Sequence, residues 1–151
     1  MDAKQLKKLS DILRSESNTE AVKKVKSIMT EDELFVLLDN YNWDNGFEVP
    51  EAIINHPNCT LPVALLAFYR ADGLRYLFEG EDVFANCLSK SWEYFIKKVY
   101  DKILKEQYPN GSISFHPEIT KIQKFKLNKL NPNLSSFILD GVSGKDLHIS
   151  L

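Results

Sequence analysis

The first forty residues alternate between apolar and polar positions with the period of an α-helix. Residues 3–15 place Leu6, Leu9, Ile12 and Leu13 on one face, with lysines and aspartates on the other. After the capping residues of SESNT, the same pattern repeats through Met29 over a basic second helix. Thr30 and Glu33 have the spacing of a capping box. They predict a third helix, and its inward face carries Leu34, Leu37, Leu38 and Tyr41.

Beyond the third helix, the sequence predicts a reversal and two more helices. Asp44-Asn45-Gly46 supplies residues that tolerate positive φ, so the chain should turn there. Pro50 suits the first turn of a short fourth helix, which His56-Pro57 ends because the residue before proline is pushed out of the α region. A fifth helix, LPVALLAFYRADG, starts at Thr60 and is apolar on almost every side. It should lie centrally and stop at Gly73, acting as a left-handed cap.

The segment from Asp82 to Tyr108 has the longest helical pattern, but its apolar pairs recur every four residues. Because a helix turns every 3.6 residues, the apolar stripe would rotate by about 40° at each step. Either different neighbours cover the two ends of this helix, or it breaks near Ser89-Lys90-Ser91. Pro109-Asn110-Gly111 then closes the helix with a turn.

The pattern weakens after residue 112. GSISFHP alternates like a short strand, LSSFILDG and KDLHISL look extended, and ITKIQKFKLNKL fits neither period. Thr30 and Thr60 both open apolar helices 30 residues apart, a spacing that suggests repeated helix pairs. We therefore predict a mainly α fold, a compact multi-helix bundle of helix pairs that could be HEAT-like, with a short mixed or β C-terminal tail. Residues 1–151 are expected to form a single helical domain, with residues 112–151 as a C-terminal extension.

Composition narrows the class of protein without naming an activity. A hydrophobic fraction of 44% with 26% charged residues is ordinary for a soluble globular protein. No apolar run is long enough for a signal peptide or a membrane span, so we expect a cytoplasmic protein. The two cysteines are too few for a disulfide framework, and free buried thiols are the default expectation.

Charge is distributed unevenly along the chain, although the formal net charge is only −2. Residues 1–30 carry seven basic and four acidic side chains, and residues 59–151 carry twelve basic and ten acidic side chains. Residues 31–58, the acidic window, hold seven carboxylates and no Lys or Arg. The local field there would attract a basic partner and repel nucleic acid.

His56 and Cys59 have an H-x-x-C spacing that could supply two zinc ligands, which Cys87 and His116 or a carboxylate would have to complete. Nothing in the sequence brings those further ligands near. We favour a structural role for His56, with a ring nitrogen bonded to backbone at a helix end. Cys59 as a nucleophile with His116 as base has less support still, because no basic cluster or helix N-terminus surrounds the thiol.

The sequence gives little support to nucleic-acid binding, phosphate binding or hydrolysis. Lys121, Lys124, Lys126 and Lys129 surround Phe125, but on a helix their directions scatter, so a solvated face is favoured over nucleic-acid binding. No glycine-rich phosphate loop, G-x-S-x-G or H-E-x-x-H occurs. We expect no cofactor, no nucleic acid and no membrane partner.

Trp43 has two interpretations. It could fold back as a core aromatic whose indole N–H bonds a helix-end carbonyl, while Asp44 caps the following turn. It could instead stand on the surface beside Asp44, Phe47 and Glu48 as an aromatic anchor with an acidic rim. We favour the first interpretation, because a small helical core needs bulky side chains.

The segments NWDNGFEVP, IINHPNC and ALLAFYRADG together resemble a bacterial family described only as a domain of unknown function, family 4274. The resemblance covers about residues 30–105 and leaves the N-terminal helices and the tail outside. It implies that these residues define the family but attaches no activity to them. The positions that carry it are Asn42, Trp43, Asp44, Gly46, Glu48, Pro50, Ile54, His56, Pro57, Cys59, Ala64, Leu65, Phe68, Tyr69, Ala71, Asp72 and Gly73.

The leading hypothesis is a non-enzymatic protein that binds another protein of basic character, an immunity protein against a basic toxin being one form of it. One alternative is a metal-binding protein or hydrolase built on His56 and Cys59. Another is a structural homodimer. The expected binding residues, which we name the acidic corner, are Trp43, Asp44, Phe47, Glu48 and Glu51.

Overall fold

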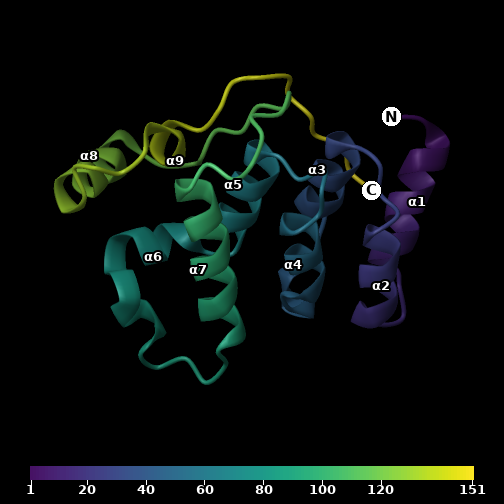
Figure 1. The fold of residues 1–151 in the computed structure, drawn as a ribbon, viewed down its shortest axis with the longest axis horizontal. Coiled ribbons are helices and arrows are strands. Elements are labelled where there is room, and N and C mark those ends of the chain that lie inside the picture. Colours follow the sequence, from purple (N-terminus) through teal and green to yellow (C-terminus); the bar gives the residue numbers. More distant parts are fainter.

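The computed structural model describes residues 1–151 and is built from nine α-helices and two short 3-10 helices (Figure 1). The mainly α prediction is therefore confirmed. In chain order the elements are α1 Ala3–Leu13, α2 Asn18–Val25, α3 Glu31–Asp39, η1 Trp43–Asn45, α4 Glu48–Ile54, α5 Leu61–Arg70, α6 Gly73–Glu79, η2 Gly80–Phe84, α7 Ser91–Leu104, α8 Lys121–Leu130 and α9 Ser136–Asp140.

Side-chain caps mark the starts of α1, α2 and α3. Thr30 Oγ1 accepts the backbone N–H of Glu33 at 3.2 Å, which satisfies one of the free donors at the start of α3. The capping box is only half formed, because the Glu33 carboxylate accepts the Thr30 hydroxyl instead of reaching the backbone. The second helix ends at Val25, earlier than predicted, and Met29 is 74% exposed rather than part of its apolar face.

The helices form successive pairs that pack side by side. Helices α1, α3 and α5 contact one another in that order, α2 packs on α4, and α7 packs on α5 (Figure 1). The pairs are thus α1 with α2, α3 with α4, and α5 with α7. Thr30 and Thr60 are the N-cap residues of α3 and α5, the first helices of the second and third pairs. This accounts for the 30-residue spacing of the two threonines.

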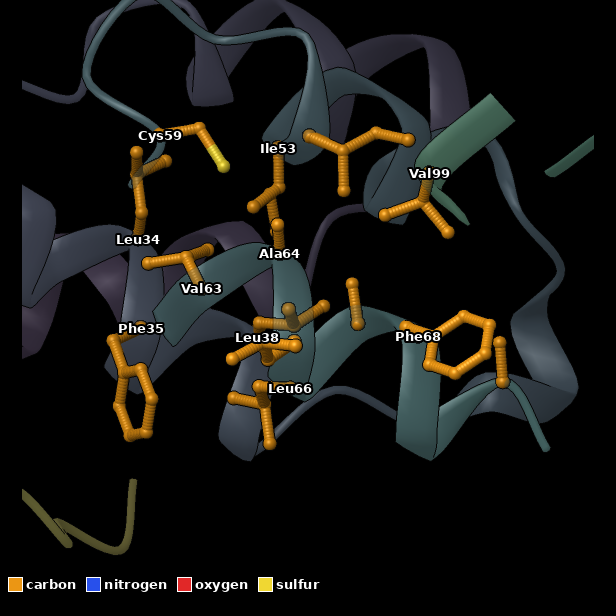
Figure 2. Close-up of a cluster of buried hydrophobic side chains, with 14 of the residues drawn as sticks. Leu34, Phe35, Leu38, Ile53, Cys59, Val63, Ala64, Leu66, Phe68 and Val99 are labelled. Carbon is orange, nitrogen blue, oxygen red and sulfur yellow. The ribbon is translucent and has the colours of Figure 1, made fainter. Parts of the chain in front are cut away.

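The hydrophobic core centres on α3 and α5. Eight of the ten residues of α5, from Leu61 to Phe68, are buried, which confirms its predicted central place. Figure 2 shows the layer between α3 and α5, closed by side chains of α4, α7 and the Cys59 loop. Its labelled members are Leu34, Phe35, Leu38, Ile53, Cys59, Val63, Ala64, Leu66, Phe68 and Val99.

The end of α5 differs from the prediction. Asp72, with φ 65°, adopts the left-handed conformation expected of Gly73, and Gly73 instead opens α6. A Cβ on Gly73 would lie 2.5 Å from the carbonyl oxygen of Phe68, so close approach to α5 is what requires glycine here. Helix α6 was not predicted from the sequence.

The long helical pattern of residues 82–108 does not form one continuous helix. This is the second of the two alternatives that its rotating apolar stripe predicted. The 3-10 helix η2 ends at Phe84, and α7 begins only at Ser91. The Trp92 indole stacks edge-on against Phe84, with ring centroids 4.9 Å apart, and its N–H donates to the carbonyl of Ala71 at 2.7 Å. Trp92 therefore ties the first turn of α7 to the end of α5.

Residues 112–151, the C-terminal segment, leave the helix pairs and then return to them. Two isolated bridges join Ile113 with Lys145 and Phe115 with Val142, so the strand-like pattern of GSISFHP is confirmed only to this extent. LSSFILDG was predicted to be extended, but it contains α9. KDLHISL runs without helix back to α3, where Asn40 Nδ2 donates to Ile149 O and Leu151 N donates to Asn40 Oδ1 (Figure 1).

None of the helices has the length and apolarity that crossing a membrane would require.

Candidate functional site

The chain turns sharply between α3 and α4, at the stretch that carries most of the predicted site. Asn42 Oδ1 accepts the backbone N–H of Asp44 at 3.0 Å and opens the 3-10 turn. Gly46 follows with φ 92°, which confirms the reversal predicted at Asp44-Asn45-Gly46. The Tyr41 hydroxyl donates to the Gly46 carbonyl at 2.8 Å. The turn is therefore fixed from within and offers a rigid platform for its side chains.

Trp43 is half-buried and packs edge-on against three rings, those of Tyr41, Phe95 and Phe47, at centroid distances of 5.6, 5.9 and 6.1 Å. It belongs with the side chains that cover the core. The bond predicted for its indole N–H is absent: the nitrogen is buried and has no hydrogen-bond partner. Trp92 makes such a bond instead.

Most of the acidic window is neutralised by residues distant in the sequence. Glu31 accepts hydrogen bonds from the hydroxyl of Thr60 and from both the backbone N–H and hydroxyl of Ser112. It therefore joins the starts of α3, α5 and the C-terminal segment. The other paired carboxylates form ion pairs at 2.6–3.7 Å, Asp32 with Lys145, Glu33 with Lys8, Asp39 with Arg70 and Glu51 with Lys98.

Asp44 and Glu48 form no ion pair, and unlike Glu31, which also forms none, neither is held by a network of hydrogen bonds. Both are exposed, and the only hydrogen bond of the Glu48 side chain is a weak one, from Asn18 Nδ2 at 3.5 Å. Asp44 donates only its backbone N–H, to Asn42. The electrostatic character of the acidic corner thus reduces to these two free carboxylates, with Glu51 beside them already engaged.

A groove of about 780 Å³ opens between α2 and α4, next to the acidic corner. Glu48 and Glu51 line it together with one cation, Lys26. Apolar contact is offered by Val22, Ile28, Ala52 and Pro57, and polar contact by Asn55, His56 and Asn58. The sequence pattern could not reveal the part that α2 contributes, because only the packing of α2 on α4 brings it there.

His56 bonds backbone at a helix end through a ring nitrogen, as predicted. Its Nδ1 accepts the backbone N–H of Asn58 at 3.0 Å, just beyond the end of α4. Burial lowers the pKa of His56, opposed by the backbone carbonyls of Ile28 and Lys26. The ring is therefore mostly uncharged at pH 7, which leaves two carboxylates and one lysine as the charges of the groove.

Cys59 lies in the core, 3% exposed, with Sγ 3.7 Å from the Thr60 carbonyl oxygen. Burial raises the pKa of the Cys59 thiol to about 12, which keeps it protonated and unreactive. No group of three or more His, Cys, Asp or Glu side chains is arranged to hold a metal ion. The structure therefore does not assemble the four-ligand set of His56, Cys59, Cys87 and His116.

A second hollow, of about 410 Å³, lies where the C-terminal segment crosses the ends of α3 and α5. Asp39 pairs there with Arg70 at 2.6 Å and lies 3.7 Å from His148. Ser114 donates to Asp146 at 2.6 Å. The Asp39–Arg70 pair is internally balanced, whereas Asp72, Glu118 and Asp146, which also line the hollow, form no ion pair.

Comparison with known proteins gives one match. The family model described as Domain of unknown function (DUF4274) covers residues 29–104, which is 76 of the 151 residues. That range runs from the approach to α3 to the end of α7 and includes the acidic corner. No curated protein and no solved structure matches the chain.

Proposed function

Because the chain belongs to the DUF4274 family, whose description assigns no activity, we propose a function from its surface. The protein is a non-enzymatic binding module whose acidic corner receives a basic protein. The observation that carries this proposal is the pair of free carboxylates, Asp44 and Glu48, in a window where every other acid has a bonded partner. Carboxylates that have no partner within the protein are available to bind basic groups of another protein.

The surroundings of these carboxylates favour a protein partner over a small ion. The groove between α2 and α4 adds apolar contact from Val22, Ala52 and Pro57 beside the acidic rim. Protein interfaces combine an apolar centre with a polar edge in this way. Glu51 can exchange its partly exposed ion pair with Lys98 for a partner's lysine or arginine at little cost, since such pairs contribute weakly.

The turn between α3 and α4 is also preorganised. Its internal hydrogen bonds, from Tyr41 to Gly46 and from Asp44 to Asn42, hold the backbone before any partner arrives. A preordered surface loses less conformational entropy on binding than a mobile loop would. An immunity protein that neutralises a basic toxin needs this combination of fast electrostatic encounter and a rigid surface, and it is the form of the function that we favour.

The proposal is tested by capture from native cell lysate with the full chain as bait, at 0.1 M and 0.5 M salt. A double variant, Asp44→Asn with Glu48→Gln, removes two charges and should lose a specific basic partner that the unaltered chain retains at low salt. The matched control, Glu118→Gln with Asp82→Asn, removes the same charge from two exposed carboxylates that form no ion pair and lie outside the acidic window and the groove.

Equal recovery by both variants would contradict the acidic corner as the binding surface, and recovery of no specific partner at either salt would contradict the protein-binding role. Light scattering after size exclusion tests the competing homodimer, which predicts a mass near 35 kDa, twice the 17.4 kDa of one chain. Elemental analysis tests the metal-binding alternative, since a stoichiometric transition metal would replace our proposal.

A further inference from the structure

Helix α8 is covered on one side only. Leu127 on its inner face is 1% exposed, whereas Ile122 and Phe125 are 67% and 61% exposed. Of the other helices only α6 makes substantial contact with it, and Figure 1 shows α8 and α9 projecting from the end of the molecule opposite α1. Leu130, at the end of the helix, is also 61% exposed. Three large apolar side chains thus point into solvent from one short arm.

The position of each residue around the helix axis follows from about 100° of rotation per residue. Ile122 and Phe125 lie on the side opposite Leu127. Lys121 and Lys126 fall on either side of this apolar pair, about 70° from its centre by the same geometry. Lys129 sits one turn further along, its Nζ 4.8 Å from the centroid of the Phe125 ring. The outer face is therefore a short apolar stripe of Ile122 and Phe125, with Lys121 and Lys126 along its edges and Lys129 in line with it at its C-terminal end.

The charge of this face has no counterpart within the protein. Residues 119–139 contain four lysines and no acidic residue. Lys124, on the inner side, pairs with Asp140 at 2.9 Å, but Lys121, Lys126 and Lys129 form no ion pair. Like charges would also oppose pairing of two α8 outer faces, which argues against a symmetric dimer through this helix. The occupant should be anionic and able to accept apolar side chains.

We propose that the outer face of α8 docks on the surface of an anionic lipid bilayer, whereas the sequence alone predicts a solvated face and no membrane partner. Ile122 and Phe125 enter the boundary between headgroups and acyl chains, and Lys121, Lys126 and Lys129 remain among the headgroups. A lipid surface fits better than an acidic protein on two counts. The face contains no Arg, Tyr or Trp, the residues that dominate protein hot spots. Lysines act as flexible point charges suited to a diffuse anionic layer.

This docking is separate from the proposed binding of a basic protein. Helix α2, which lines the groove beside the acidic corner, lies at the other end of the long axis from α8 (Figure 1). A molecule docked through α8 would therefore keep the groove clear of the bilayer. The net charge of −2 opposes general attraction to an anionic surface, so vesicle binding must come from a local patch.

The experiment is co-sedimentation of the full chain with vesicles of equal parts phosphatidylcholine and phosphatidylglycerol, against vesicles of phosphatidylcholine alone. Binding is expected to the anionic vesicles at 0.1 M salt, to fall more than about tenfold at 0.5 M salt, and to be absent without phosphatidylglycerol. Ile122→Ser with Phe125→Ser should reduce the affinity more than about tenfold, and so should Lys121→Gln with Lys126→Gln. These side chains are exposed, so circular dichroism should show an unchanged fold.

Two control variants separate α8 from general surface effects. Met29→Ser with Leu88→Ser removes apolar side chains that are 74% and 106% exposed, and Lys4→Gln with Lys23→Gln removes exposed lysines without ion pairs. Both should bind as the unaltered chain does. The proposal is overturned if anionic vesicles are not bound at 0.1 M salt, or if the controls lose as much affinity as the α8 variants. Binding of soluble polyglutamate without binding of vesicles would likewise overturn it in favour of an acidic protein.

Discussion

The helix pairs of residues 3–104 and the C-terminal segment are held in different ways. Between α3 and α5, buried apolar side chains of both helices pack together in one continuous layer, part of which Figure 2 shows. The C-terminal segment adds only scattered apolar side chains to the core, such as Ile113 and Ile138. It is also joined to distant positions by single hydrogen bonds, such as those between Asn40 and Ile149 and Leu151, 109 and 111 positions away. Periodicity in a sequence records continuous packing of a face but leaves no trace of isolated long-range bonds.

The largest expected effect contrasts one phenylalanine from each region. Phe68 is fully buried and stacks on Tyr100, with ring centroids 5.5 Å apart, so Phe68→Ala should lower the free energy of unfolding by about 3–5 kcal/mol. Phe125→Ala, at an exposed position of α8, should change it by less than about 0.5 kcal/mol. Urea denaturation measures both, and equal losses would contradict the contrast.

A smaller loss of stability is expected from adding a methyl group where α6 closely approaches α5. Gly73→Ala places a methyl group 2.5 Å from the carbonyl oxygen of Phe68, and the backbone of α5 cannot easily move away. Overpacking of this kind should cost about 1–3 kcal/mol. Thermal unfolding followed by circular dichroism measures it. An unchanged midpoint would show that α6 can shift relative to α5, and that the close approach there is not required.

Asn40→Ala should loosen the end of the C-terminal segment and leave the helix pairs in place. The variant loses two hydrogen bonds to that segment and one to the Val36 carbonyl, each contributing about 0.5–1.5 kcal/mol. Hydrogen exchange followed by mass spectrometry should show faster exchange in residues 141–151 and unchanged protection in α3 and α5. Asn128→Ala, at an exposed position of α8, is the matched control. Faster exchange throughout the core would mean that the two regions unfold as one.

The smallest expected effect is a dependence on pH at His56. Burial lowers the pKa of His56 below its ordinary value of 6.5, so the folded protein binds this proton less tightly than the unfolded chain does. The stabilisation is complete above pH 6.5 and is lost as the pH falls through the lowered pKa. Protonation also removes the acceptor for Asn58. Urea midpoints between pH 7.5 and 5 should therefore fall less steeply for His56→Gln, and parallel curves would contradict this origin.

The sequence predicted the helix pairs well because their signals are local. Thr30 caps α3, Gly46 reverses the chain, and the apolar run from Leu61 fills the centre, each as its pattern indicates. The predictions fail where contacts with residues distant in the sequence determine the local structure. Asp72 takes the left-handed conformation because Gly73 must approach α5, and α9 forms in a stretch whose pattern looks extended.

The candidate site was predicted only in part for the same reason. The acidic window is an unbalanced run of seven carboxylates in the sequence, but Lys8, Arg70, Lys98 and Lys145 approach it in space. No local pattern could indicate which acids would stay free. The groove beside them depends on the packing of α2 on α4, which is likewise a property of the fold.

The bond from Leu151 to Asn40 also bears on the order in which the protein is made. Because Leu151 takes part, residues 141–151 can dock fully only after Leu151 has left the ribosome. By then residues 1–104 have already emerged, and units near the N-terminus generally fold first during synthesis. We therefore expect protease resistance of stalled nascent chains to appear first in the helix pairs, and to reach residues 141–151 only in chains long enough to expose Leu151. Resistance of that segment in chains whose Leu151 is still inside the ribosome would contradict this order.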